Sequence, residues 1–179
     1  ALIAFGDVSG KGAAAALYGA LVSGLLRILA PRRRSPALLL KSLNETLLER
    51  KVDAVYATLM VVLWERRSAR FTIANAGSEP PLILRAGEVL KPRVEGVPIG
   101  LLDDVEYEEI GLDVSPGDAL LFYSDGIEDQ TNETEENMGE ARIKKVLRKY
   151  GASPPRELLD QLFRELDVFR GVTPIFDDQ

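Results

Sequence analysis

Short β-type runs alternate with turn residues through the middle of the chain, and this pattern constrains the fold more strongly than any other. The runs are rich in Val, Ile, Leu and Tyr, and polar or Gly- and Pro-containing turns separate them. The predicted strands cover residues 55–64, 69–76, 82–85, 88–91, 107–112 and 119–124. Because strands joined by short turns usually pair antiparallel, we expect a mainly antiparallel sheet.

A strand, a glycine loop and two helices are predicted before this region. The apolar run 1–5 and the loop 6–12 lead into an Ala- and Leu-rich segment over 13–30. That segment is apolar nearly all round, so we expect a buried helix packed on the next one. Ser35 supplies the N-cap of the second helix, which runs to about Arg50 with one leucine stripe. At the other end of the chain, helices are predicted over 140–150 and, capped by Ser153-Pro154, over 155–169.

The chain contains no Cys and no His, which narrows the chemistry it can perform. Cysteine-based catalysis, Ser-His-Asp hydrolysis, disulfide scaffolds and the usual Cys/His zinc sites all lack their necessary groups. Carboxylates remain, and with water they suit hard cations such as Mg²⁺ and Mn²⁺. The 22 basic and 28 acidic residues give a net charge of −6, which disfavours binding to nucleic acid.

One segment could be mistaken for a targeting signal. The apolar stretch from Ala13 to Ala30 follows Lys11, as in a signal peptide, but it contains Tyr18 and Arg27 and lacks a convincing cleavage context. We therefore interpret it as a helix of a cytoplasmic protein that does not insert into a membrane. The 179 residues, 46% of them hydrophobic, suit one domain.

The loop at residues 6–12 admits several interpretations. It is not a P-loop, because the spacing from Gly6 is one residue short and Gly12 follows Lys11. Residues 10–15 fit the G-x-G-x-x-A pattern of a dinucleotide site, but a second helix follows where that site needs a parallel strand. A flexible turn from strand to helix explains the glycines equally well.

Aspartates follow apolar runs at three places. Asp7 and Asp125 each come after a predicted strand, so they could meet at one rim of a sheet and hold a hard cation. The alternative interpretation of Asp125-Gly126 is an ordinary turn, which is the usual role of an isolated Asp-Gly pair. The pair Asp177-Asp178 follows Ile-Phe near the end of the sequence and is otherwise a solvated tail.

Several motifs together resemble those of bacterial metal-dependent serine/threonine phosphatases of the SpoIIE type, a PPM-like family. They occur in the same order and span nearly the whole chain, from 1 to 179. The matching motifs are Gly6–Gly12, Asn75-Ala76-Gly77 with Pro80-Pro81-Leu82, Gly96–Gly100, Pro116-Gly117-Asp118, Tyr123-Ser124-Asp125-Gly126 and Phe176-Asp177-Asp178.

This resemblance implies an α+β fold in which two antiparallel β-sheets pack as a sandwich flanked by helices. It also implies a two-metal centre holding Mn²⁺ or Mg²⁺. Asp7 resembles the bridging metal ligand, Val8 lends its backbone carbonyl, and Asp125 and Asp177 resemble ligands of the second metal. Asp7 and Asp125 are the expected catalytic residues. Asp129 matches a position where a further acidic residue supports a weak extra ion.

The chain departs from that family in three ways. The N-terminal strand pair with its Gly-Gly-Asp ligand and the final strand are missing, so the single phosphatase domain over 1–179 is expected to be incomplete at both ends. Ser78 stands where relatives usually carry His after Asn-Ala-Gly.

Two functions follow from the resemblance. The first is metal-dependent hydrolysis of phosphoserine or phosphothreonine on a protein, an anti-anti-sigma-like regulator in a stress or developmental pathway. The first two helices could then form a homodimer surface. The second is a catalytically weak or inactive regulatory module of the same fold that binds a partner, for example by strand addition at an open sheet edge.

The stretch 128–140 carries six carboxylates and no basic residue. Because runs of like charge tend towards disorder, we expect a mobile, solvated loop through 131–137, with Asp129 held closer to the metal site.

Overall fold

The computed structural model describes residues 1–32, 35–49 and 55–178. The chain divides into two compact units, Ala1–Pro80 with Arg93–Ser115 and Pro81–Pro92 with Pro116–Gln179. The first unit contains β1 (Leu2–Val8), α1 (Ala13–Leu29), the 3-10 turn η1 (Ala30–Arg32), α2 (Pro36–Leu48), β2 (Ala57–Glu65), β3 (Arg70–Ala76) and β6 (Glu109–Asp113). The second contains β4 (Leu82–Arg85), β5 (Glu88–Leu90), β7 (Ala119–Leu121), α3 (Asp125–Glu128), α4 (Gly139–Tyr150) and α5 (Pro155–Arg170).

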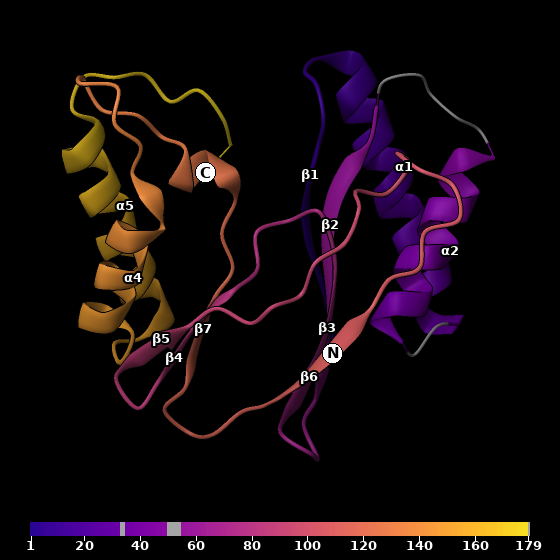
Figure 1. Ribbon diagram of the computed structural model, residues 1–179, viewed down its shortest axis with the longest axis horizontal. Coiled ribbons are helices and arrows are strands. Elements are labelled where there is room, and N and C mark those ends of the chain that lie inside the picture. Colours follow the sequence, from indigo (N-terminus) through magenta and orange to yellow (C-terminus); the bar gives the residue numbers. More distant parts are fainter. Residues whose placement is uncertain (33–34, 50–54, 179) are drawn as a thin grey trace. The chain divides into compact units, whose positions relative to one another are not determined.

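An antiparallel sheet in the order β1-β2-β3-β6 forms the first unit, and α1 and α2 cover one face of it (Figure 1). In its register, Phe5 pairs with Met60 and Ile73 with Ile110. The side chain of Ser35 accepts a hydrogen bond from the backbone N–H of Leu38, so α2 begins at its predicted cap.

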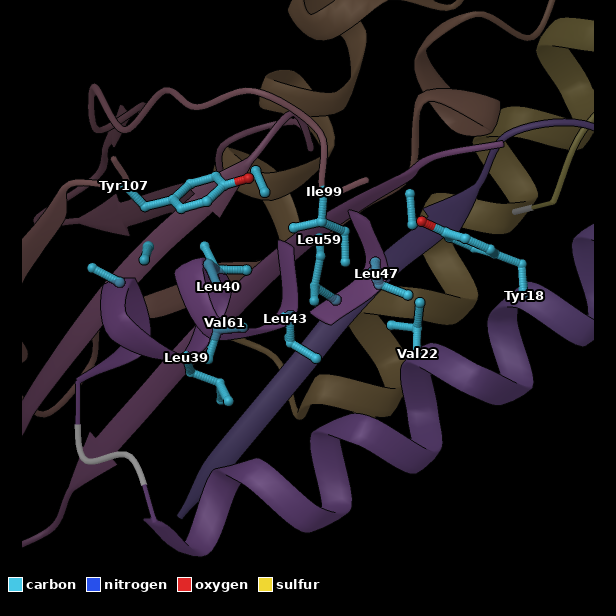
Figure 2. Packing of buried hydrophobic residues seen from close by; sticks show 14 residues of the cluster. Tyr18, Val22, Leu39, Leu40, Leu43, Leu47, Leu59, Val61, Ile99 and Tyr107 are labelled. Carbon is cyan, nitrogen blue, oxygen red and sulfur yellow. The ribbon is translucent and has the colours of Figure 1, made fainter. Parts of the chain in front are cut away.

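The leucines of α2 fill the core of this unit. Leu39, Leu40 and Leu43 are fully buried, and they pack towards Val61 of β2 (Figure 2). The stripe predicted from their spacing is therefore confirmed. The predicted end of this helix at Arg50 lies outside the described residues.

Helix α1 differs from its prediction. It forms where expected and packs beside α2, but only Tyr18 and Val22 are buried. Leu17 is 73% exposed, Leu21 43% and Ile28 58%. The expectation of a buried helix is wrong because α2 and the sheet cover only one side of it. Among the described residues, one helical stretch, Ala13–Arg32, is long and apolar enough to cross a membrane by length and composition alone.

The second unit combines a small antiparallel sheet, in the order β5-β4-β7, with three helices (Figure 1). Helices α4 and α5 bury one apolar stripe each in a common core with Leu82 and Leu121. The guanidinium of Arg85 in β4 donates two hydrogen bonds to Asp118, at 3.0 and 2.6 Å. This ion pair fixes the Pro-Gly-Asp turn that leads into β7.

The predicted α+β class with two antiparallel sheets is confirmed, and the predicted helices and hairpins lie within a few residues of the observed ones. Two details differ. Helix α5 has Pro154 as its N-cap and no side-chain capping bond, so Ser153 does not cap it. The run predicted as a strand over 119–124 pairs only through Leu121 and turns into α3 at Asp125. The single incomplete domain stays a prediction.

Candidate functional site

Asp125 lies at the first residue of α3, where the chain leaves β7 and turns. Gly126 beside it is buried, and a Cβ built there would lie only 2.2 Å from the carbonyl oxygen of Asp178. The hydroxyl of Ser124 donates a hydrogen bond to the carbonyl oxygen of Asp178 at 2.8 Å. The C-terminal segment therefore returns to the α3 turn (Figure 1), and only glycine leaves room for it there.

A cavity of about 130 Å³ opens at this turn within the second unit. The residues that line it are Asp125, Gly126, Asp129, Gln130, Phe176 and Asp177, and none of them is basic. The structure thus brings together two predicted ligands, Asp125 and Asp177, and places Asp129 with them. Oxygen ligands facing a small cavity without a counter-charge suit a hard cation.

Two amides that the sequence analysis missed hold this cavity in shape. Gln130, only 3% exposed, donates to the carbonyl oxygens of Thr131 and Pro174 at 3.0 and 3.1 Å. These bonds tie the exit of α3 to the C-terminal segment. Asn137 donates to the Asp129 carboxylate at 3.3 Å. No local pattern marks Gln130, because its partner Pro174 is distant in sequence.

The acidic stretch after α3 is a hydrogen-bonded turn. The side-chain oxygen of Asn132 accepts bonds from the backbone N–H groups of Thr134 and Glu136, both at 2.9 Å. Thr131 and Asn137 form an isolated antiparallel bridge. The stretch is solvated, as predicted, since residues 133–137 are exposed. Its carboxylates are partnered: Glu136 accepts a hydrogen bond from Asn132 and pairs with Arg142, and Glu133 accepts from the backbone N–H of Val172. These bonds favour an ordered turn over the predicted mobile loop.

Asp7 and Val8 belong to the first unit, as the last two residues of β1. The backbone N–H of Asp7 donates to the hydroxyl of Thr58 in β2 at 3.3 Å. The Asp7 carboxylate is exposed and forms no hydrogen bond or ion pair with the described residues. The strand carrying it is largely exposed, which corrects the expectation that Asp7 follows a buried strand.

The glycines of the loop after β1 have a conformational role. Gly10 and Gly12 adopt φ values of 91° and 81°, which favour glycine, and Gly12 directly precedes α1. The backbone N–H of Ser9 donates to the carbonyl oxygen of Tyr56 at 2.9 Å, and the backbone N–H of Tyr56 donates to the Ser9 hydroxyl at 2.9 Å. The strand-to-helix turn is therefore anchored to the start of β2.

Across residues 1–32, 35–49 and 55–178, no group of three or more carboxylates lies close enough together to hold an ion. The donor chemistry fits Mg²⁺ or Mn²⁺, since every candidate ligand is an oxygen. Because Asp7 and Val8 belong to one unit and Asp125 and Asp177 to the other, their union in a single centre stays a prediction.

The Asn75-Ala76-Gly77 motif of the first unit contacts the segment that contains Val94 and Pro98. Asn75, 2% exposed, donates to the carbonyl oxygens of Ser78 and Val94 at 2.7 and 2.9 Å. The backbone N–H of Ser78 donates back to the Asn75 side chain at 2.9 Å. A Cβ on Gly77 would lie 2.7 Å from the Pro98 ring. These motifs position loops, and Ser78 takes part through its backbone.

Two buried hydroxyls in this unit have no hydrogen-bond partner among the described residues, those of Ser78 and Tyr107. Burial raises the pKa of Tyr107 to about 12, so this phenol stays protonated at neutral pH. Neither hydroxyl belongs to the predicted ligand set.

Comparison with known proteins assigns the chain to one family. A family model described as "Stage II sporulation protein E (SpoIIE)" matches residues 1–179. A relative from Bacillus subtilis (strain 168), "Phosphoserine phosphatase RsbU", is 25% identical over 92% of this chain and 49% of its own length. The chain spans between 15% and 49% of the length of the curated relatives it matches.

Solved structures share the fold. The PP2C phosphatase domain of SpoIIE from Bacillus subtilis has a TM-score of 0.83 and 26% identity, over 99% of this chain and 52% of that one. The catalytic domain of the serine/threonine phosphatase PstP, in complex with two manganese ions, has a TM-score of 0.64 and 17% identity. That match covers 96% of this chain and 83% of PstP, and at such identity it shows the fold alone.

Proposed function

Because the chain belongs to the SpoIIE family, we propose that it is a metal-dependent protein serine/threonine phosphatase. The observation that carries the proposal is that Asp125, Asp129 and Asp177 line one cavity, where Gly126 leaves room for the returning C-terminal segment. A relative named as a phosphoserine phosphatase supports the activity.

The residues that would hold the metals are the Asp7 carboxylate, the Val8 carbonyl, Asp125 and Asp177. When bound, Mn²⁺ or Mg²⁺ lowers the pKa of water and offsets negative charge on phosphoryl oxygens. The carboxylates of this chain orient the ions, and Gly126 keeps the backbone close enough for Asp125 and Asp177 to act together. Water is then the nucleophile, which agrees with a chain that contains no Cys and no His.

The proposed substrate is a phosphoserine or phosphothreonine on a protein regulator of the anti-anti-sigma type, in the cytoplasm. The support is the similarity to RsbU over 92% of this chain. The cavity at Asp125 opens to solvent through exposed carboxylates, which suits a residue presented on the surface of another protein.

We also propose that a second copy of the chain binds to the exposed apolar face of α1, so that the protein forms a homodimer. Leu17, Leu21 and Ile28 lie on one exposed face of this helix, and burying them in a homodimer would remove apolar surface from water. Sedimentation equilibrium should show dimers that Leu17→Asp disrupts. Leu159→Asp on α5, where the leucine is 44% exposed, is the matched control. Monomers at all concentrations, or binding of α1 to lipid vesicles instead, would contradict this assignment.

A catalytically weak regulatory module is the second candidate. It is favoured by the lack of a preformed group of three or more metal-ligating carboxylates among the described residues. The exposed edge strand β1 offers backbone groups to an incoming strand.

Hydrolysis of a phosphoserine peptide, measured while Mn²⁺ or Mg²⁺ is titrated, separates the two candidates. Asp7→Ala and Asp125→Ala should each lower the rate by at least about a hundredfold, since each removes a charge that holds a metal. Asp103→Ala and Asp160→Ala change exposed aspartates, one in each unit, and should leave the rate unchanged. Full activity in EDTA, or in either ligand variant, would rule out the two-metal phosphatase.

A further inference from the structure

A second cavity, of about 320 Å³, lies between α4 and α5 in the second unit. Its floor is apolar and includes Met138, Val146 and Phe169, and Val168 at its side is 81% exposed. The two helices lie beside each other (Figure 1). The lining residues come from both of them, so we describe the cavity as a groove between α4 and α5. Its volume falls at the lower end of the range of about 300–1,000 Å³ that is usual for ligand pockets.

The rim of this groove is basic. Arg142, Lys145 and Lys149 line it from α4, and Glu165 is the one acidic residue in the lining. The whole chain carries a net charge of −6, so the groove has the opposite sign to the molecule around it. Three basic residues against one acidic residue in the lining favour an acidic ligand at this place.

Two of the three cations are held in place. The Arg142 guanidinium lies 4.6 Å from the centre of the Phe169 ring and donates to the carbonyl oxygens of Asn137 and Met138. It also pairs with the exposed carboxylate of Glu136 at 3.8 Å, which an acidic ligand would have to displace or share. The Lys149 ammonium lies 4.7 Å from the centre of the Tyr150 ring. Lys145 is exposed and makes no hydrogen bond or ion pair within the described part of the chain. The groove therefore offers ordered cations beside an apolar floor.

The spacing of these cations limits the ligand. Arg142 and Lys149 are seven residues apart on one helix, which separates them by about 10 Å along the axis. A single phosphate or carboxylate cannot reach both, whereas acidic side chains spaced along a peptide can. A flat membrane surface would contact only the outermost lining residue, Val168, whereas a side chain inserted between the helices would also contact the half-buried Phe169.

We propose that the groove between α4 and α5 binds an acidic segment of a partner protein, with one apolar or aromatic side chain of that segment inserted between the helices. The acidic side chains pair with Arg142, Lys145 and Lys149, and the anchor contacts Phe169 and Val168. The proposal uses none of the predicted metal ligands, so it is independent of the phosphatase activity.

Fluorescence anisotropy with an array of labelled peptides tests this assignment. In each peptide, glutamates flank a different central anchor, Leu, Phe, Tyr or Trp, and binding is measured in EDTA. Saturable binding of at least one peptide is expected. Lys145→Glu should weaken it about tenfold, since a rim cation becomes repulsive. Arg148→Glu makes the same charge change on the same helix outside the groove, and it should alter the affinity less than about twofold.

A second pair of variants tests the apolar contact. Val168→Asp places a charge at the side of the groove, whereas Val172→Asp changes a valine that is 86% exposed and outside the lining. Only the first should weaken binding of the peptide. Equal losses within either pair would show that overall charge is responsible and would overturn the proposal. Absence of saturable binding to every peptide would also overturn it, as would binding to phosphatidylserine vesicles that Lys145→Glu abolishes while no peptide binds.

Discussion

Helix α1 of the first unit and helices α4 and α5 of the second use apolar residues in opposite ways. Helix α1 is almost entirely apolar, yet only Tyr18 and Val22 are buried. Helices α4 and α5 are rich in charged residues, yet each buries one apolar stripe, such as Leu158, Leu162 and Leu166 on α5. Periodicity thus predicts which side of a helix is covered, whereas apolar content alone does not.

The largest expected effect is the difference in stability between an aspartate placed on the buried side of α5 and one placed on the exposed side of α1. Leu162 is 1% exposed, so Leu162→Asp should cost about 3–5 kcal/mol of stability or prevent folding. Leu17 on α1 is 73% exposed, so Leu17→Asp should change the free energy of unfolding of the monomer by less than about 0.5 kcal/mol. Urea unfolding at low protein concentration measures both.

A milder pair keeps this test usable if Leu162→Asp does not fold. Leu162→Ala should cost about 2–5 kcal/mol, and Leu17→Ala should cost much less. Similar losses at the two positions would show that α1 is covered in the monomer, and the contrast between the helices would then be wrong.

Buried and exposed asparagine side chains extend the comparison to polar groups. Asn75 in the first unit is 2% exposed and makes three hydrogen bonds to backbone groups. Asn75→Ala leaves buried partners unsatisfied and should cost about 2–4 kcal/mol. Asn132 in the second unit also accepts several bonds, but its turn is exposed. Asn132→Ala should cost about 1 kcal/mol, because water can replace the lost bonds. Thermal unfolding of the two variants tests this ranking. Equal losses of stability would show that burial does not decide the cost, and the ranking would be wrong.

Much of the fold could be predicted from local sequence. The cap at Ser35, the leucine stripe of α2 and the turns between strands are all encoded within a few residues, and the structure shows each of them. The exposure of α1 could not be predicted, because a helix that is apolar all round carries no signal for the side that packs. The order within the turn after α3 was missed, because it depends on one side chain, Asn132, which accepts hydrogen bonds from two backbone N–H groups of the turn.

The candidate site was predictable from the sequence only in its local parts. Asp125 and Asp177 follow apolar runs, and their motifs mark them in the sequence. The contacts that bring them to one cavity are long-range, from Ser124 to Asp178 and from Gln130 to Pro174. Such pairings depend on the path of the whole C-terminal segment, so single-sequence patterns do not contain them.

The tie from Gln130 to the C-terminal segment gives a smaller expected effect. Gln130→Ala removes the bonds to Thr131 and Pro174 and should cost about 1–2 kcal/mol. Amide exchange should increase mainly in residues 172–178, because this side chain holds that segment against α3. Asn137→Ala, which removes only the longer bond to Asp129, is the control and should leave exchange there unchanged. Faster exchange throughout the second unit would instead assign Gln130 to the general stability of that unit.

The smallest expected effect is a pH dependence at the start of α4. Glu140 pairs with Lys144 on its own helix and with Lys91 beyond β5. The hydrogen bond from Lys144, followed by that from Lys91, lowers the pKa of Glu140 below its usual value of 4.5. A carboxyl group whose pKa is lower in the folded state stabilises the fold above its unfolded pKa, and this stabilisation is lost as the pH falls through the folded pKa.

Glu140→Gln should therefore cost about 0.5–1 kcal/mol at neutral pH, the modest value of a partly exposed ion-pair network. The difference from the unchanged protein should shrink as the pH falls below 4.5. Lys144→Met removes the larger of the two causes and should reduce the pH-dependent part of the stability without abolishing it, since Lys91 remains. Urea unfolding between pH 7 and pH 3 measures all three proteins. A difference that stays constant over this range, or grows towards low pH, would mean that Glu140 contributes by helix propensity alone and that its ion pairs add no net stability to the second unit.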